Sequence, residues 1–456
     1  MTDPALDAAI AKLTADGAAP SVIASFIDRF NRLASGETGY VHEADLEPLT
    51  DPPMLADQTL DDAAMQALAQ TAVVRLNGGL GTSMGLAGPK CLIPVRDGLT
   101  FLDIVVRQIL ALREAHDVRL PLLLMNSFNT SEASLKALEQ YPQLPVGDLP
   151  LEFVQSREPK LLDDTRMPAA WPANPDLEWC PPGHGDFYPS LYASGLITKL
   201  LDEGFRYLFV ANIDNLGAVP DPRLAGWFAA SGAPYAAEIS ERTDMDRKGG
   251  HLAHRIADGR LVLRDTAQVS PDEMDSFIDI VKHPWTHTNN LWLDLRQVAA
   301  VLDANEGMLS LPLIINKKTV DPADATSPAV VQLEGAMGAA VEVFDGAQAI
   351  GVPRSRFLPV KATADLLILR SDIYEFTDDA RLIGRASSPV VRLDPDFFKL
   401  IDDFEARFPA GPPSLVEATS LHVTGDFTFG KGVVVRGDAV LSTDTPQSIP
   451  DGTVVD

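Results

Sequence analysis

Residues 73–90 read VVRLNGGLGTSMGLAGPK, and the rest of the chain is interpreted around this stretch. An apolar run ends at Leu76, and a glycine-rich loop that closes with Lys90 follows it. The loop contains five glycines: Gly78, Gly79, Gly81, Gly85 and Gly88. Glycine lets the backbone approach a ligand closely, and successive backbone N–H groups can then point at anionic oxygens. The pattern predicts a strand, a phosphate-binding loop and a lysine whose charge binds phosphate.

Two common glycine-rich motifs fit this loop poorly. A P-loop ends in G-K-[ST], whereas Pro89 precedes Lys90 here and Cys91 follows it. A dinucleotide-binding G-x-G-x-x-G motif could begin at Gly79, but Met84 occupies the place of its third glycine. The alternative of a loop that serves only a tight turn stays open, although the five glycines and the lysine favour phosphate binding.

Length and charge limit the classes of function. A chain of 456 residues can bury a large core and is expected to hold two or three domains. Its formal charge of −27 and its isoelectric point near 4.6 argue against general binding to nucleic acid or to anionic membranes. An acidic protein with an anionic substrate needs a locally basic site, so lysines near glycines are of interest.

The cysteines and the N-terminal sequence bear on the compartment. Cys91 and Cys180 are the two cysteines of the chain, which predicts no disulfide framework and suits a reducing environment. The first residues, MTDPALDAAIAKL, lack the charged and apolar regions of a signal peptide. No apolar run reaches membrane-spanning length. We therefore expect a cytoplasmic protein.

The distribution of apolar residues predicts an α/β fold. Residues 1–70 are expected to form a helical N-terminal region, with a break between Gly17 and Pro20. Apolar strands then alternate with amphipathic helices, one of which Thr100 can cap. This alternation predicts a mostly parallel sheet with helices on both faces.

Several polar residues follow predicted strands of this sheet. These residues are Asn126, Gln155 and Asp214, and the glycine-rich loop also follows a predicted strand. Ligands bind open α/β sheets beyond the carboxyl ends of the strands, so we expect these residues to converge on one edge.

The apolar period changes near the C-terminus. Two series of apolar residues are spaced by six: Leu421, Phe427, Val433 and Ala439, and Val423, Phe429, Val435 and Leu441. Such a repeat with interspersed glycines predicts about one β-helix coil, with a β-hairpin meander as the alternative. Prolines and charges between residues 372 and 389 suggest a boundary. We expect three regions: 1–70, a catalytic domain at 71–375, and a C-terminal domain at 376–456.

Asp214 is the candidate for a metal ligand. It lies in FVANIDNLG, just past a predicted strand. Mg²⁺ prefers oxygen and usually binds through one or two carboxylates together with substrate phosphates. An Asx turn or a helix cap at the strand end is an equally good interpretation of this residue on its own.

Other polar residues are open to two interpretations from their type alone. Gln155 can recognise the edge of a pyrimidine or lie on the surface, and His184 in PPGHGD can be a ligand or, more often, structural. Asn289, like its neighbour in TNNLW, can occupy a turn, and Glu334 can begin a helix. Lys361 at the end of FLPVK is ordinarily a solvated lysine.

The chain resembles a known family in several segments that occur in one order. The segments are LNGGLGTSMGLAGPK at Leu76, TFLD at Thr100, LLLMNSFNT at Leu122, PPGHGD at Pro181, FVANIDNLG at Phe209, KGG at Lys248, TNNLW at Thr288, VPRSRFLPVK at Val352 and TGDFTFGKGV at Thr424. They resemble the eukaryotic-type UTP–glucose-1-phosphate uridylyltransferases, also called UDP-glucose pyrophosphorylases. The resemblance implies a Rossmann-like (GT-A-like) nucleotidyltransferase core and a short C-terminal left-handed β-helix.

The resemblance also implies an activity and a set of site residues. The activity is the reversible, Mg²⁺-dependent conversion of UTP and glucose 1-phosphate to UDP-glucose and pyrophosphate. The nucleotide would contact Leu76, Asn77, Gly78, Gly79, Lys90, Gln155, Gly183, Asp214 and Lys361. The sugar phosphate would contact His184, Asn212, Ile213, Asp214, Asn289 and Glu334. Asn290 would share sugar recognition with Asn289, and Lys248 and Lys318 are weaker candidates for phosphate contacts. Lys361, Lys90 and Asp214 would be catalytic, and Asp214 would hold Mg²⁺.

Two other functions and the assembly state remain to be considered. Related enzymes that make other UDP-sugars or UDP-N-acetylhexosamines usually carry alanine in place of Asn77 and arginine in place of Ser83. A catalytically silent nucleotide-sugar sensor should have lost the charged residues that this chain retains. The short, acidic, proline-containing tail after Leu441 favours a monomer or at most a dimer.

Overall fold

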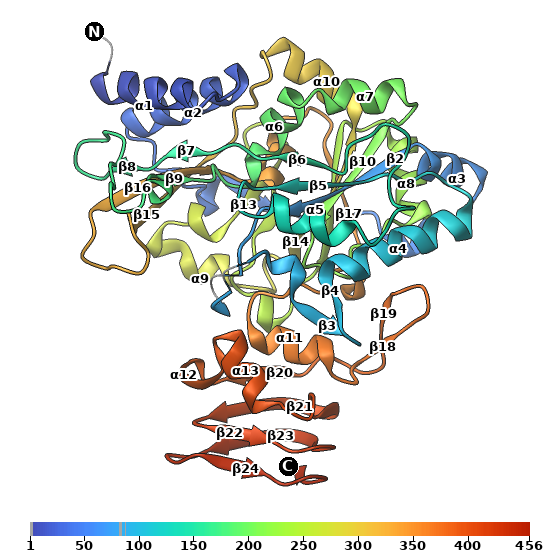
Figure 1. Cartoon of the computed structure of the whole chain (residues 1–456). Coiled ribbons are helices and arrows are strands. Elements are labelled where there is room, and N and C mark those ends of the chain that lie inside the picture. The colour runs from blue at the N-terminus through green and yellow to red at the C-terminus, as the bar shows by residue number, and fades with distance from the viewer. Residues whose placement is uncertain (1–2, 82–83, 87) are drawn as a thin grey trace.

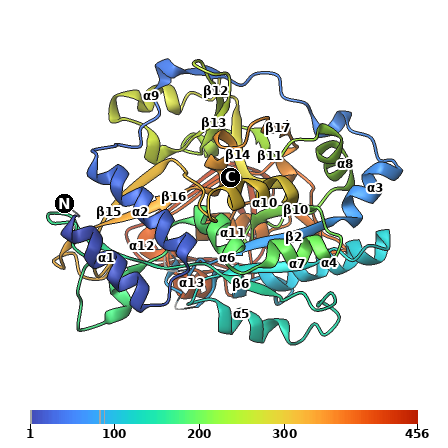
Figure 2. The same ribbon diagram turned by 90° about the horizontal axis from the view of Figure 1, so that it is seen from above.

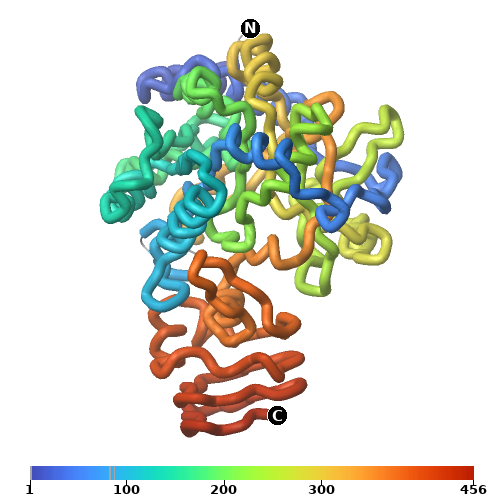
Figure 3. The backbone as a smooth tube through the Cα atoms, turned by 90° about the vertical axis from the view of Figure 1, so that its right-hand side faces the viewer, coloured from blue at the N-terminus to red at the C-terminus, as the bar shows by residue number. Residues whose placement is uncertain are grey.

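The computed structural model describes residues 3–81, 84–86 and 88–456. The chain forms an α/β body built on a mixed sheet, and the C-terminal strands project from it as a stack (Figure 1). The tube view shows this stack farthest from the N-terminus (Figure 3). No helix among the described residues is both long and apolar enough to span a membrane.

The central sheet has ten strands. They are β1 (Leu46–Pro48), β2 (Thr71–Asn77), β5 (Leu122–Asn126), β6 (Glu152–Val154), β10 (Tyr207–Asn212), β11 (Tyr235–Glu241), β12 (His251–Arg255), β13 (Leu261–Arg264), β14 (Trp285–Asp294) and β17 (Gln348–Gly351). The main path is β1-β12-β14-β10-β2-β5-β6, while β11 pairs with β14 and β17, and β13 pairs with β12.

The expectation of a mostly parallel sheet is correct for one half only. Strands β10, β2, β5 and β6 are parallel neighbours, but β14 runs antiparallel to β10, β11 and β12. Strand β12 ends at Arg255 and β13 begins at Leu261, and so short a connection can join antiparallel strands but not parallel ones. The antiparallel pairing of β12 with β13 therefore follows from a connection that lacks a crossover helix.

The helices cover both faces of the sheet, as predicted. They are α1 (Pro4–Ala15), α2 (Pro20–Ala34), α3 (Asp62–Ala69), α4 (Phe101–His116), α5 (Ser131–Leu138), α6 (Phe187–Ala193), α7 (Leu196–Asp202), α8 (Pro222–Ser231), α9 (Met274–Phe277), α10 (Leu295–Ala304), α11 (Thr363–Arg370), α12 (Pro395–Phe398) and α13 (Ile401–Arg407). Successive residues of a strand point to opposite faces. Val73 accordingly packs in the core with α4 and α8, and Val74 packs with α6, α7 and α10. Figure 2 shows α6, α7 and α10 over the sheet.

Local sequence explains several of these elements. The predicted cap of α4 is confirmed: Thr100 and Asp103 form a capping box, in which each side chain accepts a backbone N–H of the other. The predicted break between the first two helices is also present, because α1 ends at Ala15 and α2 starts at Pro20. The N-terminal region is not wholly helical, however, since β1 pairs with β12 and joins the central sheet.

Smaller strands surround the sheet. They are β3 (Pro94–Arg96), β4 (Leu99–Thr100), β7 (Glu158–Pro159), β8 (Leu161–Leu162), β9 (Trp179–Cys180), β15 (Leu313–Thr319), β16 (Ala329–Gly335), β18 (Tyr374–Phe376) and β19 (Leu382–Gly384). Strands β15, β16 and β8 form a three-stranded sheet whose apolar side packs on α1 and α2. Both cysteines are buried free thiols.

The C-terminal strands stack in parallel. They are β20 (Val390–Leu393), β21 (Ser414–Thr424), β22 (Phe427–Phe429), β23 (Val434–Ser442), β24 (Gln447–Ile449) and β25 (Val454–Val455). Strands β20, β21, β23 and β25 pair in parallel in that order, and β22 pairs in parallel with β24. This excludes the hairpin meander, whose neighbouring strands are antiparallel. The stack is longer than the one coil expected, because β20 before the repeat and β24 and β25 after it also pair in parallel.

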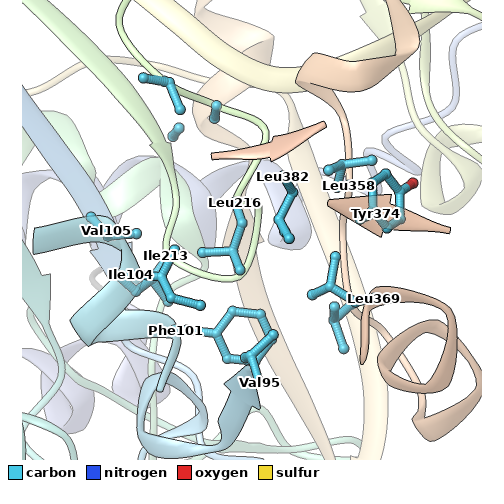
Figure 4. Close-up of a cluster of buried hydrophobic side chains, with 14 of the residues drawn as sticks. Val95, Phe101, Ile104, Val105, Ile213, Leu216, Leu358, Leu369, Tyr374 and Leu382 are labelled. Carbon is cyan, nitrogen blue, oxygen red and sulfur yellow. The ribbon is translucent and has the colours of Figure 1, made fainter. Parts of the chain in front are cut away.

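One apolar cluster joins the α/β body to the segment before the stack (Figure 4). It combines side chains of β3 and α4, of the loop after β10, and of the chain between residues 358 and 382. The labelled members are Val95, Phe101, Ile104, Val105, Ile213, Leu216, Leu358, Leu369, Tyr374 and Leu382. The loop after β10 is thus held between α4 and the segment that carries Lys361.

Candidate active site

The carboxyl ends of the parallel strands meet at one edge, as predicted. Asn77 is the register partner of Asn126, which in turn pairs with Val154. Leu76 pairs with Asn212, and its carbonyl oxygen accepts the N–H of Ile213 at 3.1 Å. The glycine-rich loop, Gln155 and Asp214 therefore leave the sheet at the same edge.

Gly78 and Gln155 lie in direct contact. A Cβ atom added to Gly78 would stand 2.5 Å from Oε1 of Gln155, so a larger residue would have to displace this amide. The N–H of Gln155 donates to the carbonyl oxygen of Asn126 at 2.7 Å, and Ser127 Oγ donates to that of Gly78 at 2.9 Å. The structure thus brings together the two residues that were expected to hold a nucleobase.

Asn77 faces the interior rather than the edge. Its side chain is buried, and its Nδ2 donates to Asn126 Oδ1 at 2.7 Å and to Ser134 Oγ at 2.8 Å. A contact between Asn77 and a nucleotide would have to be made by its backbone. Ser83, which was used to separate this chain from related enzymes, lies outside the described residues.

Asp186 is a residue of this site that the sequence did not single out. Its buried carboxylate accepts the N–H and the Oγ of Ser156 at 2.6 and 2.7 Å, and Ser190 Oγ at 2.6 Å. Burial raises the pKa of this carboxyl, while these hydrogen bonds oppose the rise. Asp186 therefore ties the residue after Gln155 to the loop of His184. The sequence signal that could have indicated Asp186 is its position in the PPGHGD segment of the family resemblance.

Lys90 and Asp214 form an ion pair between two loops. Nζ of Lys90 lies 2.5 Å from Oδ2 of Asp214 and also donates to the carbonyl oxygen of Val360. Both side chains are mostly but not completely buried. One ammonium group therefore connects the glycine-rich loop, the end of β10 and the residue before Lys361.

Lys361 itself is exposed. Its backbone N–H donates to Asp365 Oδ2 at 2.7 Å at the start of α11. Among the described residues, no carboxylate forms an ion pair with its ammonium group. The charge of Lys361 is thus available to an anion at the same edge as the Lys90–Asp214 pair.

Asn212 and Asn289 also come together. Asn289 Nδ2 donates to Asn212 Oδ1 at 2.9 Å, and Asn289 adopts a left-handed backbone with φ of +60°. Asparagine tolerates this conformation better than most residues. The next residue, Asn290, points the other way into the core and is fully buried. Of the two asparagines in TNNLW, only Asn289 faces the edge.

Gly183, His184 and Glu334 meet on the other side of the site. A Cβ on Gly183, whose φ is +77°, would stand 2.6 Å from the carbonyl oxygen of Gly335 and 3.0 Å from Cβ of Glu334. His184 Nδ1 accepts the N–H of Met337 at 2.8 Å, which requires a neutral ring. Desolvation by the surrounding protein atoms lowers the pKa of His184 from its ordinary value, although the side chain remains exposed to solvent.

Two weaker lysine candidates lie apart from Lys90. Lys318 is 4.0 Å from Oε1 of Glu334, at the sugar-phosphate side of the predicted site. Lys248 is exposed, and its carbonyl oxygen accepts the hydroxyl of Thr266. Neither shares a hydrogen bond with Asp214 in the described part of the chain.

The donor set near Asp214 is compatible with Mg²⁺ but does not form a complete cage. Within residues 3–81, 84–86 and 88–456, no three His, Cys, Asp or Glu side chains cluster closely enough to hold a metal. A single carboxylate suffices for a Mg²⁺ ion whose other ligands are phosphate oxygens and water. The site therefore fits a metal that arrives with a phosphorylated substrate.

Comparison with known proteins decides the family. The family model of UTP–glucose-1-phosphate uridylyltransferase matches residues 23–436. The chain belongs to this family. The barley (Hordeum vulgare) UTP–glucose-1-phosphate uridylyltransferase is 40% identical over 447 residues, which cover 95% of this chain and 92% of the relative. A probable member from Schizosaccharomyces pombe is 41% identical over 397 residues, with 85% and 76% covered.

Solved structures give the same result for the fold of this uridylyltransferase family member. UDP-glucose phosphorylase from Trypanosoma brucei matches with a TM-score of 0.93 at 42% identity, covering 99% of this chain and 98% of that one. A variant of UDP-glucose pyrophosphorylase from Leishmania major in complex with UDP-glucose matches with a TM-score of 0.94 at 41% identity, covering 100% and 98%.

Proposed function

We propose that this chain catalyses the reversible reaction of UTP with glucose 1-phosphate to give UDP-glucose and pyrophosphate. The observation that carries the proposal is the Lys90–Asp214 pair at the carboxyl edge of the parallel strands, beside the exposed Lys361. The family supports it, as does the UDP-glucose complex of the Leishmania major relative.

The reaction needs positioning and charge neutralisation more than proton transfer. A phosphate oxygen of glucose 1-phosphate attacks the α-phosphorus of UTP in line, and the bond from that phosphorus to the β-phosphate oxygen breaks. The attacking oxygen is already ionised, so no general base is required. His184, whose Nδ1 is taken by Met337, is therefore assigned to binding rather than to proton removal.

The nucleotide side of the site is built from the glycine-rich loop and its neighbours. Gly78 and Gly79 would place their backbone against uridine, and the amide of Gln155 would hydrogen-bond the uracil edge. Lys90 would exchange its contact with Asp214 for phosphate oxygens, and Lys361 would stabilise charge where the two substrates meet. A Mg²⁺ ion held by Asp214 would supply charge neutralisation at the triphosphate.

The sugar-phosphate side lies across the edge. The side chains of Asn212 and Asn289 share a hydrogen bond and present amide groups that suit sugar hydroxyls. Glu334 lies against Gly183, where its carboxylate could accept sugar hydroxyls. The buried Ile213 would contribute its backbone.

The finer features of the fold belong to the same proposal. The parallel C-terminal stack supports a left-handed β-helix, and the strand order around the site supports a GT-A-like core. The three regions, 1–70, 71–375 and 376–456, remain predictions. The apolar cluster of Figure 4 crosses the second boundary, so we expect the last two regions to unfold together.

A panel of sugar 1-phosphates tests the activity. Pyrophosphate release from UTP and Mg²⁺ should be fastest with glucose 1-phosphate and slower with galactose 1-phosphate and N-acetylglucosamine 1-phosphate. Preference for the N-acetylated sugar would instead assign the chain to the related pyrophosphorylases. Binding of UDP-glucose without turnover in either direction would make it a nucleotide-sugar sensor.

A further inference from the structure

A buried polar cluster lies directly behind the site. It consists of Arg75, Asn215, Glu238, Asn290 and Arg356, all of them buried. Burying so many polar groups is unfavourable unless they are hydrogen-bonded to one another. The cluster joins β2, β11 and β14 to two loops that carry predicted catalytic residues.

Asn215 is the centre of this cluster. Its Nδ2 donates to Asn290 Oδ1 and to the carbonyl oxygen of Arg356, each at 3.1 Å. Its Oδ1 accepts the N–H of Leu358 at 2.8 Å. The side chain therefore connects the residue next to Asp214 with the segment that ends at Lys361.

The partners of Asn215 are themselves held firmly. Glu238 binds the guanidinium of Arg356 through two hydrogen bonds, of 2.8 and 2.7 Å, and accepts Asn290 Nδ2 at 3.1 Å. Gly217 lies so close to the backbone of residues 355 and 356 that an added Cβ would collide with the carbonyl oxygen of Ser355. The two loops are thus in close backbone contact, and Asn215 fixes their register.

Lys90 is a second link between the same two loops, because it contacts both Asp214 and the carbonyl oxygen of Val360. A phosphate bound to Lys90 would compete with both contacts. The hydrogen bonds of Asn215 do not involve any group assigned to substrate. They can therefore persist when Lys90 turns to phosphate, together with the backbone contact of Gly217 and the hydrogen bond from Arg356 to the carbonyl oxygen of Val219.

We propose that Asn215 is a positioning residue that holds the Leu358–Lys361 segment against the Asp214 loop, so that Lys361 keeps its place during uridylyl transfer. The inference rests on the proposed role of Lys361. Asn215 does not touch substrate, and its effect on the rate is exerted through Lys361.

A double-mutant cycle of Asn215→Ala and Lys361→Ala tests the proposal. Lys361→Ala alone should lower kcat by roughly 10² to 10³, the range for the loss of one preorganised electrostatic group. Asn215→Ala alone should lower kcat by up to about 10², as a displacement of about 1 Å can. In the Lys361→Ala background, Asn215→Ala should change kcat by less than about threefold, because residues that act as a unit are not additive.

Two controls separate positioning from loss of stability. Calorimetric titration with UDP-glucose should show a full complement of binding sites in Asn215→Ala, as expected if the variant is folded. Gln268→Ala removes another buried amide, which lies away from the Asn215 cluster, and should lower Tm without lowering kcat. Asn215→Asp, which keeps the acceptor for Leu358 but loses both donations, is assayed in the same cycle if the alanine variant does not fold.

The outcomes are distinguishable. Additive losses in the cycle, or an unchanged kcat for Asn215→Ala, would overturn the inference and leave the proposed function intact. Near-normal turnover of Lys361→Ala would reject the role of Lys361 and the inference with it. Failure of both Asn215 variants to fold would make the residue structural and overturn the proposal.

Discussion

Lys90 Nζ and Asp214 Oδ2 lie 2.5 Å apart, although 124 positions separate the two residues in sequence. The pair joins the cation assigned to phosphate and the carboxylate assigned to Mg²⁺. If both proposed roles hold, binding of a Mg²⁺–triphosphate would require an exchange of partners: Lys90 would move to phosphate oxygens, and Asp214 would hold the metal. Each group would then gain a new opposite charge, so neither would be left unpaired.

Asp214→Asn tests the carboxylate in this exchange. The change removes a charge and nearly preserves shape, so we expect a higher Mg²⁺ midpoint together with a lower kcat. A Mg²⁺ titration of pyrophosphate release at saturating UTP measures both. Asp221→Asn is the matched control, because Asp221 caps α8 and pairs with Arg223 outside the site. An unchanged midpoint and kcat in Asp214→Asn would show that Asp214 is not the ligand.

Gln155→Ala should impair the use of UTP more than that of glucose 1-phosphate. One lost hydrogen bond to an uncharged partner costs about 0.5–1.5 kcal/mol, or about a 2- to 13-fold rise in the KM of UTP. Gly78→Ala should have a similar effect, because its Cβ would displace the amide of Gln155. The two changes should be less than additive when combined. A rise confined to the KM of glucose 1-phosphate would reassign Gln155 to the sugar side.

The convergence of the site was predictable, but the direction of individual side chains was not. Parallel strands end at one edge whatever their details, so strand order in the sequence was enough to place Asn126, Gln155 and Asp214. Adjacent strand residues point to opposite sides, and nothing in TNNLW indicates which asparagine faces out. Asn289 faces the edge only because β14 pairs between β10 and β11 in the register observed.

The buried cluster was missed for a related reason. In the sequence, Arg75 is a single charged residue within the apolar run of β2, and nothing indicates that it is buried. Its hydrogen-bond partners are backbone carbonyl groups of residues 212–218, which are distant in sequence. The antiparallel strands were likewise missed, because alternation of apolar segments specifies strands without specifying their direction. Both features depend on contacts between segments that are distant in sequence.

His287 should make stability depend on pH. Its Nδ1 accepts the N–H of Asn289 at 3.2 Å, and desolvation, aided by nearby His184, lowers its pKa from 6.5 to about 3. The unfolded chain therefore binds an extra proton between about pH 6.5 and pH 3, and stability is lost as pH falls through that window. His287→Asn should reduce this slope by up to about 1.4 kcal/mol per pH unit.

Urea unfolding at several pH values from 7 downward measures this effect. Other groups also titrate in that range, so the difference between the variant and the unmodified protein is the relevant quantity. Gln268→Ala removes a buried side chain that does not titrate, so it is the control and should leave the slope unchanged. Parallel slopes for His287→Asn and the unmodified protein would contradict the assignment.

The last prediction concerns assembly. Strand β25 is the last strand of the parallel stack, and an open strand edge invites pairing with another chain unless it is short, charged or interrupted by proline. Here β25 has two residues, and the segment around it contains Pro446, Pro450 and three aspartates. We therefore expect a monomer or at most a dimer in light scattering at micromolar concentration, and an octamer would refute this expectation.

Removal of residues 420–456 tests what the stack contributes. Phe429 packs on Phe408 with ring centroids 4.8 Å apart, and several deleted side chains belong to the same apolar cluster as α4. The deletion should expose this surface and lower Tm, yet it removes none of the residues assigned to substrate. Turnover per folded molecule should therefore persist at temperatures well below the new Tm. Complete loss of turnover in a folded, monomeric deletion variant would instead show that the stack supports the site directly.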